Sequence, residues 1–333
     1  MKLLKYLILL ILLAIITVPV VLFFSWKLSD AEKLDMLIMD KTVLKTETAE
    51  HRSVMWVLNH NRIFKSDNKP YSLNEDYYGF KPIKPYSGKK YEIKSIDIEE
   101  IDSLASVNDI LYFTDTYGVF FHEWHNMDSY NRPSSIIYGG LNQNDYLLIR
   151  EMLKRKKPVI SEFNLLGYPT SPLTSYKAQQ LFNLKWSGWS GRYYHSLDYQ
   201  NNEQLPEWMV SLYKENHNDE WAFKNGGIVF VKNGSKIVVL EEGTELSENG
   251  FTIQTTESMM AKFGLPNEII SNCWFDIVEP QTNQYQVISN FNLDVTNNAS
   301  DKLKRNGIPT EFPAVLYGGE EFPFYYFSGD FSK

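Results

Sequence analysis

Three carboxyl residues and a glycine pair stand at the ends of predicted strands. Asp40 and Asp115 each follow an apolar run of strand length, Glu162 lies in another such run, and Gly139 and Gly140 follow a fourth. The runs cover residues 34–39, 110–114, 159–163 and 135–138. In an open α/β sheet, ligands bind beyond the carboxyl ends of the parallel strands, so the sequence predicts a site at that edge.

Two of these carboxyls suit acid–base chemistry. Glycoside cleavage uses a pair of carboxyl groups, one on each side of the bond that breaks, and a partly desolvated acid opposite an ionised one divides the two roles. Asp115 and Glu162 are therefore the candidate catalytic pair. The alternative is that Glu162 accepts hydrogen bonds from backbone amides and only shapes the loop that follows it.

The densest aromatic stretch of the chain is WSGWSGRYY, residues 186–194. A repeated Trp-Ser-Gly pattern predicts that two indoles, Trp186 and Trp189, protrude beside the guanidinium of Arg192. With Tyr193 they form a candidate platform for a sugar ring or an anionic ligand. Asn164, in the loop after Glu162, is a further candidate ligand-binding residue. The alternative is a loop that folds its tryptophans into a small core of its own.

Two further features are weaker indications of a ligand. Gly139 and Gly140, with Asp40 at the same predicted edge, permit close backbone approach at a helix N-terminus, where an anion could rest, but tight helix–strand packing explains the glycines equally well. His122, His125 and Asp128 have an H-x-x-H-x-x-D spacing, and such side chains suit zinc or iron. This spacing is not the H-E-x-x-H zinc motif, and polar loop histidines are the favoured interpretation, so no cofactor is predicted.

The order of apolar strands and amphipathic helices predicts an α/β fold. We expect a mostly parallel, doubly wound, flavodoxin-like sheet with helices on both faces, including helices over residues 46–58 and 144–154. The run GIVFVKNGSKIVVL, residues 227–240, predicts an antiparallel hairpin added to this sheet, with Asn233 and Gly234 at its turn.

The first residues predict a membrane anchor. MKLLK is followed by an uncharged apolar run, residues 6–26, that is long enough to cross a bilayer as one helix. Positive charge before the run places the N-terminus in the cytoplasm, which makes this a single-pass protein of the cytoplasmic membrane. Residues 1–33 then form the anchor and linker, and residues 34–333 form a domain outside the cytoplasm. A cleaved signal peptide is the alternative, although no small-x-small cleavage site follows the run.

Composition excludes several classes of protein. The chain has 333 residues and a net charge of −8, and it lacks the basic face of a nucleic-acid-binding protein. Its only cysteine, Cys273, excludes an intramolecular disulfide, a thiolate zinc cluster and a CxxC redox pair. The context SNCWFDIV predicts that Cys273 is buried and unreactive.

The chain resembles the glutamine-amidotransferase-like superfamily. The resemblance lies in the strand that ends at Tyr138-Gly139-Gly140, the helix after it, the strand with Glu162 and the closing FYYFSGDF, residues 324–331. It is to the branches without amidotransferase activity, which include trehalose-utilisation-type and membrane-anchored domains. It implies the fold but no glutaminase activity, because the chain has no cysteine in a glycine elbow between strand and helix.

These observations predict a membrane-anchored domain that binds an envelope saccharide. The first alternative is a glycan hydrolase that uses Asp115 and Glu162. The second is a structural subunit that contacts a membrane-protein partner through its anchor and its aromatic stretch.

Overall fold

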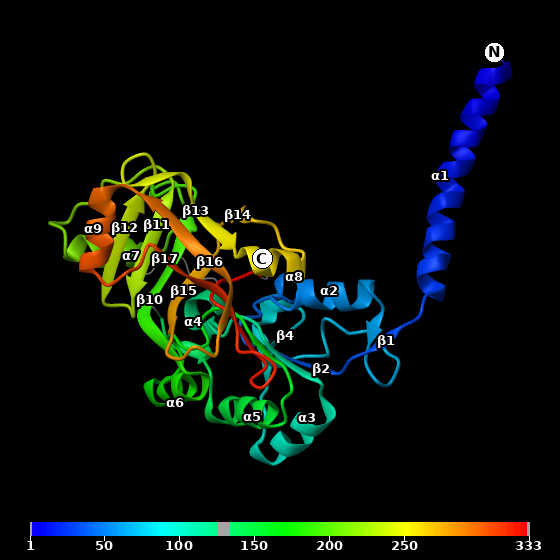
Figure 1. The fold of residues 1–333 in the computed structure, drawn as a ribbon, viewed down its shortest axis with the longest axis horizontal. Helices are drawn as coiled ribbons and strands as arrows, with labels where there is room; N and C mark the ends of the chain where they lie inside the picture. Colours follow the sequence, from blue (N-terminus) through cyan, green and yellow to red (C-terminus); the bar gives the residue numbers. More distant parts are fainter. Residues whose placement is uncertain (1, 126–133, 332–333) are drawn as a thin grey trace.

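A sheet of ten strands runs through the protein, and a second sheet of four strands packs against part of it (Figure 1). The computed structural model describes residues 2–125 and 134–331. In spatial order the ten strands are β14 (Glu268–Ile270), β13 (Leu246–Thr255), β16 (Gln286–Val295), β17 (Glu311–Tyr317), β18 (Phe324–Phe327), β9 (Val159–Ser161), β6 (Ile110–Phe113), β2 (Met36–Asp40), β4 (Tyr78–Ile83) and β5 (Lys90–Lys94).

The ten-stranded sheet is mixed, so the expectation of a mostly parallel, flavodoxin-like sheet is not confirmed. Strands β18, β9, β6, β2 and β4 form a parallel half. The remaining pairs, from β14 to β18 and between β4 and β5, are antiparallel. The loop 318–323 between β17 and β18 is too short for the crossover that a parallel pair requires.

Helices cover both faces of the parallel half, as an α/β fold requires. Successive side chains of a strand point to opposite faces of the sheet, so neighbours in the sequence pack against different helices. Leu37 and Met39 of β2 share a core with one set of helices, whereas Ile38 between them packs in a separate core with α2 (Arg52–His60). The first set comprises α3 (Ile101–Val107), α5 (Gln143–Lys154) and α6 (Pro172–Phe182).

Two expected helices have different outcomes. The helix predicted over residues 144–154 is confirmed as α5. The Asn142 side chain caps this helix, because it accepts hydrogen bonds from two backbone N–H groups of the first turn. The helix predicted over residues 46–58 starts late, since a 3₁₀ turn at Thr46–Thr48 precedes α2. Further 3₁₀ turns lie at Tyr86–Gly88 and Ile98–Glu100.

The antiparallel half packs on the second sheet as a sandwich. An aromatic core fills the interface, where the ring of Phe275 contacts Phe230 of one sheet and Phe251 and Phe291 of the other. The second sheet has the order β12 (Lys236–Glu241), β11 (Gly227–Lys232), β10 (Leu184–Tyr194) and β15 (Trp274–Pro280). The helices of this part are α7 (Glu207–Glu215), α8 (Glu257–Phe263) and α9 (Asn297–Arg305).

The predicted hairpin is present but belongs to the second sheet. β11 and β12 pair directly, and Asn233 and Gly234 at the turn both have positive φ, as a tight hairpin turn demands. The predicted strand at residues 135–138 also lies elsewhere. It is β8 (Ile136–Tyr138), which pairs with β7 (Val119–Phe120), next to α4 (Phe121–His125), and not with the ten-stranded sheet.

The N-terminal helix α1 (Lys2–Leu28) projects from the rest of the protein (Figure 1). Its residues 4–28 are long and apolar enough to cross a membrane, as an anchor or a signal sequence would be. The linker after α1 contains the short strand β1 (Glu32–Lys33), which pairs in parallel with β3 (Ile63–Phe64).

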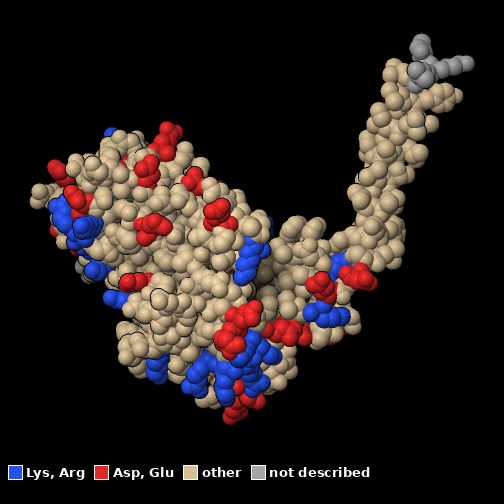
Figure 2. All heavy atoms as spheres, viewed as in Figure 1, with Lys and Arg blue, Asp and Glu red and all other residues tan. Residues whose placement is uncertain are grey.

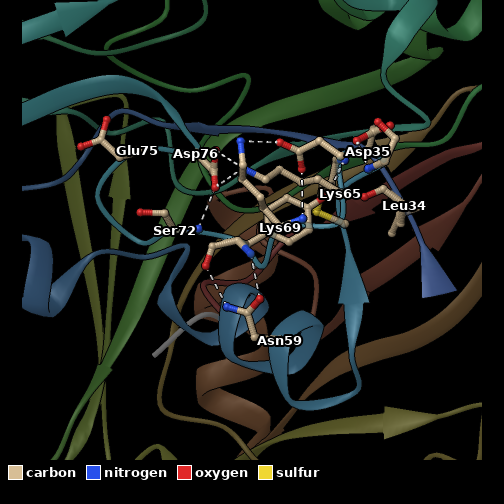
Figure 3. Close-up of polar contacts among 12 residues, drawn as sticks. Leu34, Asp35, Asn59, Lys65, Lys69, Ser72, Glu75 and Asp76 are labelled. Carbon is tan, nitrogen blue, oxygen red and sulfur yellow. Dashed lines mark hydrogen bonds and ion pairs between the residues drawn. The ribbon is translucent and has the colours of Figure 1, made fainter. Parts of the chain in front are cut away.

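A polar network holds the segment after β3 on the domain (Figure 3). Lys65 Nζ donates to both carboxylate oxygens of Asp76 at 2.8 Å, and Ser72 N donates to Asp76 Oδ2 at 2.7 Å. The Asn59 side chain of α2 makes two 2.8 Å hydrogen bonds to the backbone of Tyr71. The segment after β3 is thus joined to α2.

Candidate functional site

Four parallel strands, β2, β6, β9 and β18, end at one edge of the sheet, called here the carboxyl edge. The convergence predicted for Asp40 and Glu162 therefore occurs, and β18 brings Asp330 to the same place. The loop after β2 supplies two more ionisable groups. We call the group the carboxyl cluster: Asp40, Glu50, His51, Tyr112, Glu162 and Asp330, all of them buried.

Glu162 has one satisfied and one unsatisfied carboxyl oxygen. The Tyr112 hydroxyl donates to Oε1, while Oε2 is buried and has no hydrogen-bond partner among the residues that the structure describes. Burial raises the pKa of Glu162 to about 8; the Tyr112 hydrogen bond opposes this change, and the charges of Asp330, Glu50 and Asp40 add to it. At neutral pH the carboxyl is therefore mostly protonated. Because Tyr112 donates to Oε1, a proton bound to this carboxyl would lie on Oε2.

Asp40 and His51 form a second, fully satisfied pair. His51 Nδ1 lies 2.7 Å from Asp40 Oδ2, and His51 Nε2 lies 3.0 Å from the carbonyl oxygen of Leu73. A carbonyl only accepts, so Nε2 carries a hydrogen. The pair fixes the loop between β2 and α2 beside Glu162.

A buried ion pair ties the glycine turn to the same edge. Lys41 forms a salt bridge with Asp145 in the first turn of α5, and its Nζ also donates to the carbonyl oxygen of Gly140 at 2.7 Å. A Cβ on Gly140 would lie within 3 Å of the backbone at Pro169 and Thr170, so no larger residue fits. The glycine serves close packing here, which is the alternative that the sequence left open.

Another buried carboxyl holds the loop after Glu162. Asp276 of β15 accepts hydrogen bonds from the backbone N–H of Asn164 at 2.8 Å, from Ser190 at 2.7 Å and from Tyr326 at 3.2 Å. Burial raises the pKa of Asp276 to about 6, although all three hydrogen bonds oppose the change. Asn164, with φ of +67°, is thus fixed by the second sheet.

A hollow of about 300 Å³ opens beside the loop that follows β2. This volume is at the lower end of the range for small-molecule sites. Its walls combine aromatic and charged side chains with one threonine and one leucine. They are Leu44, Lys45, Thr48, Tyr86, Lys89, Glu123 and Trp124.

Comparison with known proteins leaves the family of this chain open. No protein-family model matches the sequence, and no curated protein matches it. Among solved structures, a ThuA-like protein from Bacteroides uniformis is similar over 91% of this chain and 84% of that chain, with a TM-score of 0.39 and 10% sequence identity.

The second carboxyl of the predicted pair, Asp115, lies at the end of β6. It is buried, and its Oδ1 accepts a hydrogen bond from the backbone N–H of Tyr117 at 2.6 Å. The charges that act most strongly on Glu162 belong to Asp330, Glu50 and Asp40. The structure therefore brings Glu162 next to these three groups.

The expected pair of protruding indoles is not present. The stretch is a strand, β10, and Trp189 is only 1% exposed, with its N–H donating to the carbonyl oxygen of Asn306 at 3.1 Å. Trp186 is half-buried against the core of the ten-stranded sheet. The two glycines of the repeat have separate roles: Gly188, with φ of +84°, lies at a β-bulge, and Gly191 makes room for the ring of Phe275.

The neighbouring candidates on β10 point in different directions. Arg192 donates to Gln204 and lies over the rings of Tyr194 and Trp274, so its guanidinium is engaged within the second sheet. Tyr193 packs against the sandwich core beside His195. The structure does not place either side chain in the carboxyl cluster.

The histidines proposed as weak metal ligands lie on α4. His122 is hydrogen-bonded to Ser134, and His125 packs on the ring of Phe121. Asp128 lies outside the described residues. Within residues 2–125 and 134–331, no three His, Cys, Asp or Glu side chains form a group that could hold a metal ion.

Sequence reasoning missed four members of the carboxyl cluster: Glu50, His51, Tyr112 and Asp330. Asp330 follows the last strand, so it satisfies the same strand-end criterion that selected Asp40. Tyr112 is a polar-tipped residue inside an apolar strand, one position before the end, and faces α2. No local pattern marks His51, because its partner Asp40 lies eleven residues earlier, across a turn.

Proposed function

We propose that this chain is a membrane-anchored protein whose domain lies outside the cytoplasm and binds a hydroxyl-rich ligand, an envelope saccharide, at the carboxyl cluster. The observation that carries the proposal is Oε2 of Glu162, a buried oxygen with no partner among the described residues. Buried polar atoms in folded proteins are nearly always hydrogen-bonded, so an orphaned one in a cluster of ionisable groups indicates a ligand or water position.

The chemistry of the cluster favours sugar hydroxyls over anions. Protonated Glu162 offers a donor at Oε2, and the carboxylates around it offer acceptors. A hydroxyl group both donates and accepts, so it fits such a set. A phosphate or sulfate is an anion, and it would be repelled by the charges of Asp40 and Asp330.

The hollow beside the loop has room for a ligand of monosaccharide size, although none of the six cluster residues lines it. The loop that carries Glu50 and His51 also contributes Lys45 and Thr48 to the wall of the hollow. Tyr86 adds a partly exposed ring, and sugar rings pack well on aromatic faces. The anchor is supported by α1, whose residues 4–28 match the thickness of a bilayer, and by the positive residues at its start.

Binding of a saccharide is expected to weaken above pH 8 and to become independent of pH in Glu162→Gln. Ionisation of Glu162 removes the Oε2 donor, whereas glutamine supplies an N–H in the same position at every pH. The affinity of the wild type should fall about tenfold per pH unit above the pKa of Glu162. Titration calorimetry with a panel of hexoses, amino sugars and disaccharides, on the full chain in detergent, would measure this.

Two variants complete the test. Glu162→Leu removes both donor and acceptor and should abolish binding, while Glu203→Gln changes an exposed carboxyl and should leave it unchanged. If Glu162→Leu binds every saccharide as tightly as the wild type does, Glu162 is not at the binding site and the proposal is wrong.

A glycan hydrolase is the second candidate, favoured by the same raised pKa. A carboxylic acid that remains protonated at pH 7 suits protonation of a glycosidic oxygen, and another carboxylate must then act as base or nucleophile. Asp40, Asp330 and the predicted Asp115 are the candidates for that role. Glu162→Gln separates the two functions: a hydrolase would lose product formation while it retained substrate binding.

A further inference from the structure

Ten consecutive residues, 261–270, are exposed although they include four large apolar side chains. Phe263 is 41% exposed, Leu265 39%, Ile269 49% and Ile270 61%. The segment covers the end of α8 and all of β14, which is the outermost strand of the ten-stranded sheet. Edge strands are usually protected by charges or by a covering element, so an apolar one marks a surface that something else covers.

The position of this segment indicates what covers it. α8 and β14 lie along the upper edge of the domain in Figure 1, as α2 does, and α1 projects toward that side. Charged side chains are dense on the lower edge, over α3 and α5, and others lie on the upper left part that carries α9 (Figure 2). The apolar segment thus lies on the side of the molecule from which a bilayer containing α1 would approach.

The exposed face of α2 is joined to the end of α1. Trp56 is 63% exposed, and its ring stacks on His60 at 4.6 Å between centroids. The carbonyl oxygen of His60 accepts a hydrogen bond from Trp26 Nε1 at 2.6 Å, and the Arg62 guanidinium lies 5.5 Å from the Trp26 ring. Tryptophan and arginine side chains are typical of the level where a helix leaves the membrane.

We propose that this surface, the interfacial edge, rests on the outer leaflet of the membrane that holds α1. It comprises Trp56, Val57, Phe263, Leu265, Ile269 and Ile270. The proposal rests on the proposed function, since it requires that α1 is retained as an anchor. A lipid surface fits better than a partner protein because α2, one part of the edge, is hydrogen-bonded to the end of the span. The edge also mixes apolar and aromatic side chains with Lys262 and Arg62, as interfacial segments do.

The consequence for function is a fixed orientation of the domain. A domain held only by the linker, residues 29–35, would rotate freely about the end of α1. With α2 and β14 on the leaflet, two separate parts of the domain contact the membrane, and the carboxyl edge keeps one orientation relative to the envelope. Saccharide binding and membrane contact then act through different surfaces of the same domain.

The test uses the full chain in nanodiscs of phosphatidylethanolamine and phosphatidylglycerol. A nitroxide is attached at Ile269→Cys in a Cys273→Ser background, and its collisions with oxygen and with a water-soluble nickel complex are compared. We expect loss of nickel collisions and retention of oxygen collisions at position 269. Val107→Cys is the matched control: Val107 is equally apolar, 61% exposed and on α3 at the lower edge, so its label should collide freely with nickel.

A measurement on the unaltered chain guards against effects of the label. Amide exchange of residues 261–270 should be slower in nanodiscs than in detergent micelles that cover only α1, while exchange of α3 should not differ. Full nickel access at position 269, with unchanged exchange, overturns the interfacial edge and leaves the anchor intact. A chain recovered without residues 1–28 overturns the anchor itself. Saccharide binding, measured separately, is affected by neither result.

Discussion

Glu162→Gln is expected to raise the stability of the folded chain by about 5 kcal/mol above pH 8 and to leave it unchanged near pH 4. Burial raises the pKa of Glu162 from 4.5 to about 8 in the folded state. Between these two values the folded chain holds a proton that the unfolded chain releases, so the stability of the wild type falls as pH rises. Glutamine has no such proton, and the variant escapes this loss.

Thermal unfolding in mild detergent at several pH values measures the difference. The melting temperature of the variant should exceed that of the wild type by roughly 10 °C at pH 9, and the two should converge toward pH 4. Glu203→Gln, at an exposed site, should follow the wild type throughout. If the melting temperatures of wild type and Glu162→Gln differ by the same amount from pH 4 to pH 9, Glu162 ionises with the ordinary pKa of a glutamate and the prediction is wrong.

The expected gain in stability of Glu162→Gln bears on function, because it means that the carboxyl cluster lowers the stability of the folded chain. Above neutral pH, Glu162 would be a buried charge close to Asp40, Glu50 and Asp330. Evolution retains such groups where they contact a ligand or transfer a proton, and a neutral side chain would serve packing better. A stabilising substitution that removes the response of binding to pH would therefore link the cluster to a ligand.

Local signals in the sequence were enough to predict part of the parallel half of the sheet, but not β4. Apolar runs fully buried on both faces identified β2, β6 and β9, and the strand-end rule placed Asp40 and Glu162 at one edge. The turn at Asn233 and Gly234 fixed the hairpin of β11 and β12. These features depend on residues within about ten positions of one another, where composition and spacing carry the information.

Pairing between distant segments could not be read in this way. Nothing local distinguishes a strand that joins the parallel half from one that turns back, so the antiparallel half and the second sheet were not expected. The strand β8 has the length and composition of a core strand, yet it pairs with β7. Asp330 and Glu50 act on Glu162 only because β18 and the loop after β2 meet β9 in three dimensions.

Trp189→Ala is expected to destabilise the chain by about 3–5 kcal/mol and to leave saccharide affinity unchanged in the molecules that remain folded. Trp189 is among the largest fully buried side chains, and its removal leaves a cavity between the two sheets and an unpaired carbonyl oxygen at Asn306. Trp189→Phe keeps most of the volume and should cost less. Chemical denaturation of the three chains, with affinity measured below the transition, provides the comparison.

The half-buried Trp186 distinguishes the two interpretations of this stretch. If β10 serves packing, Trp186→Ala should cost less stability than Trp189→Ala, since its ring lies against the edge of one core and its N–H has no partner among the described residues to lose. If the tryptophans form a sugar platform, both substitutions should abolish binding with little change in stability. Loss of binding by Trp189→Ala without loss of stability would contradict the core role, because a side chain that is 1% exposed cannot leave the sandwich without disturbing it.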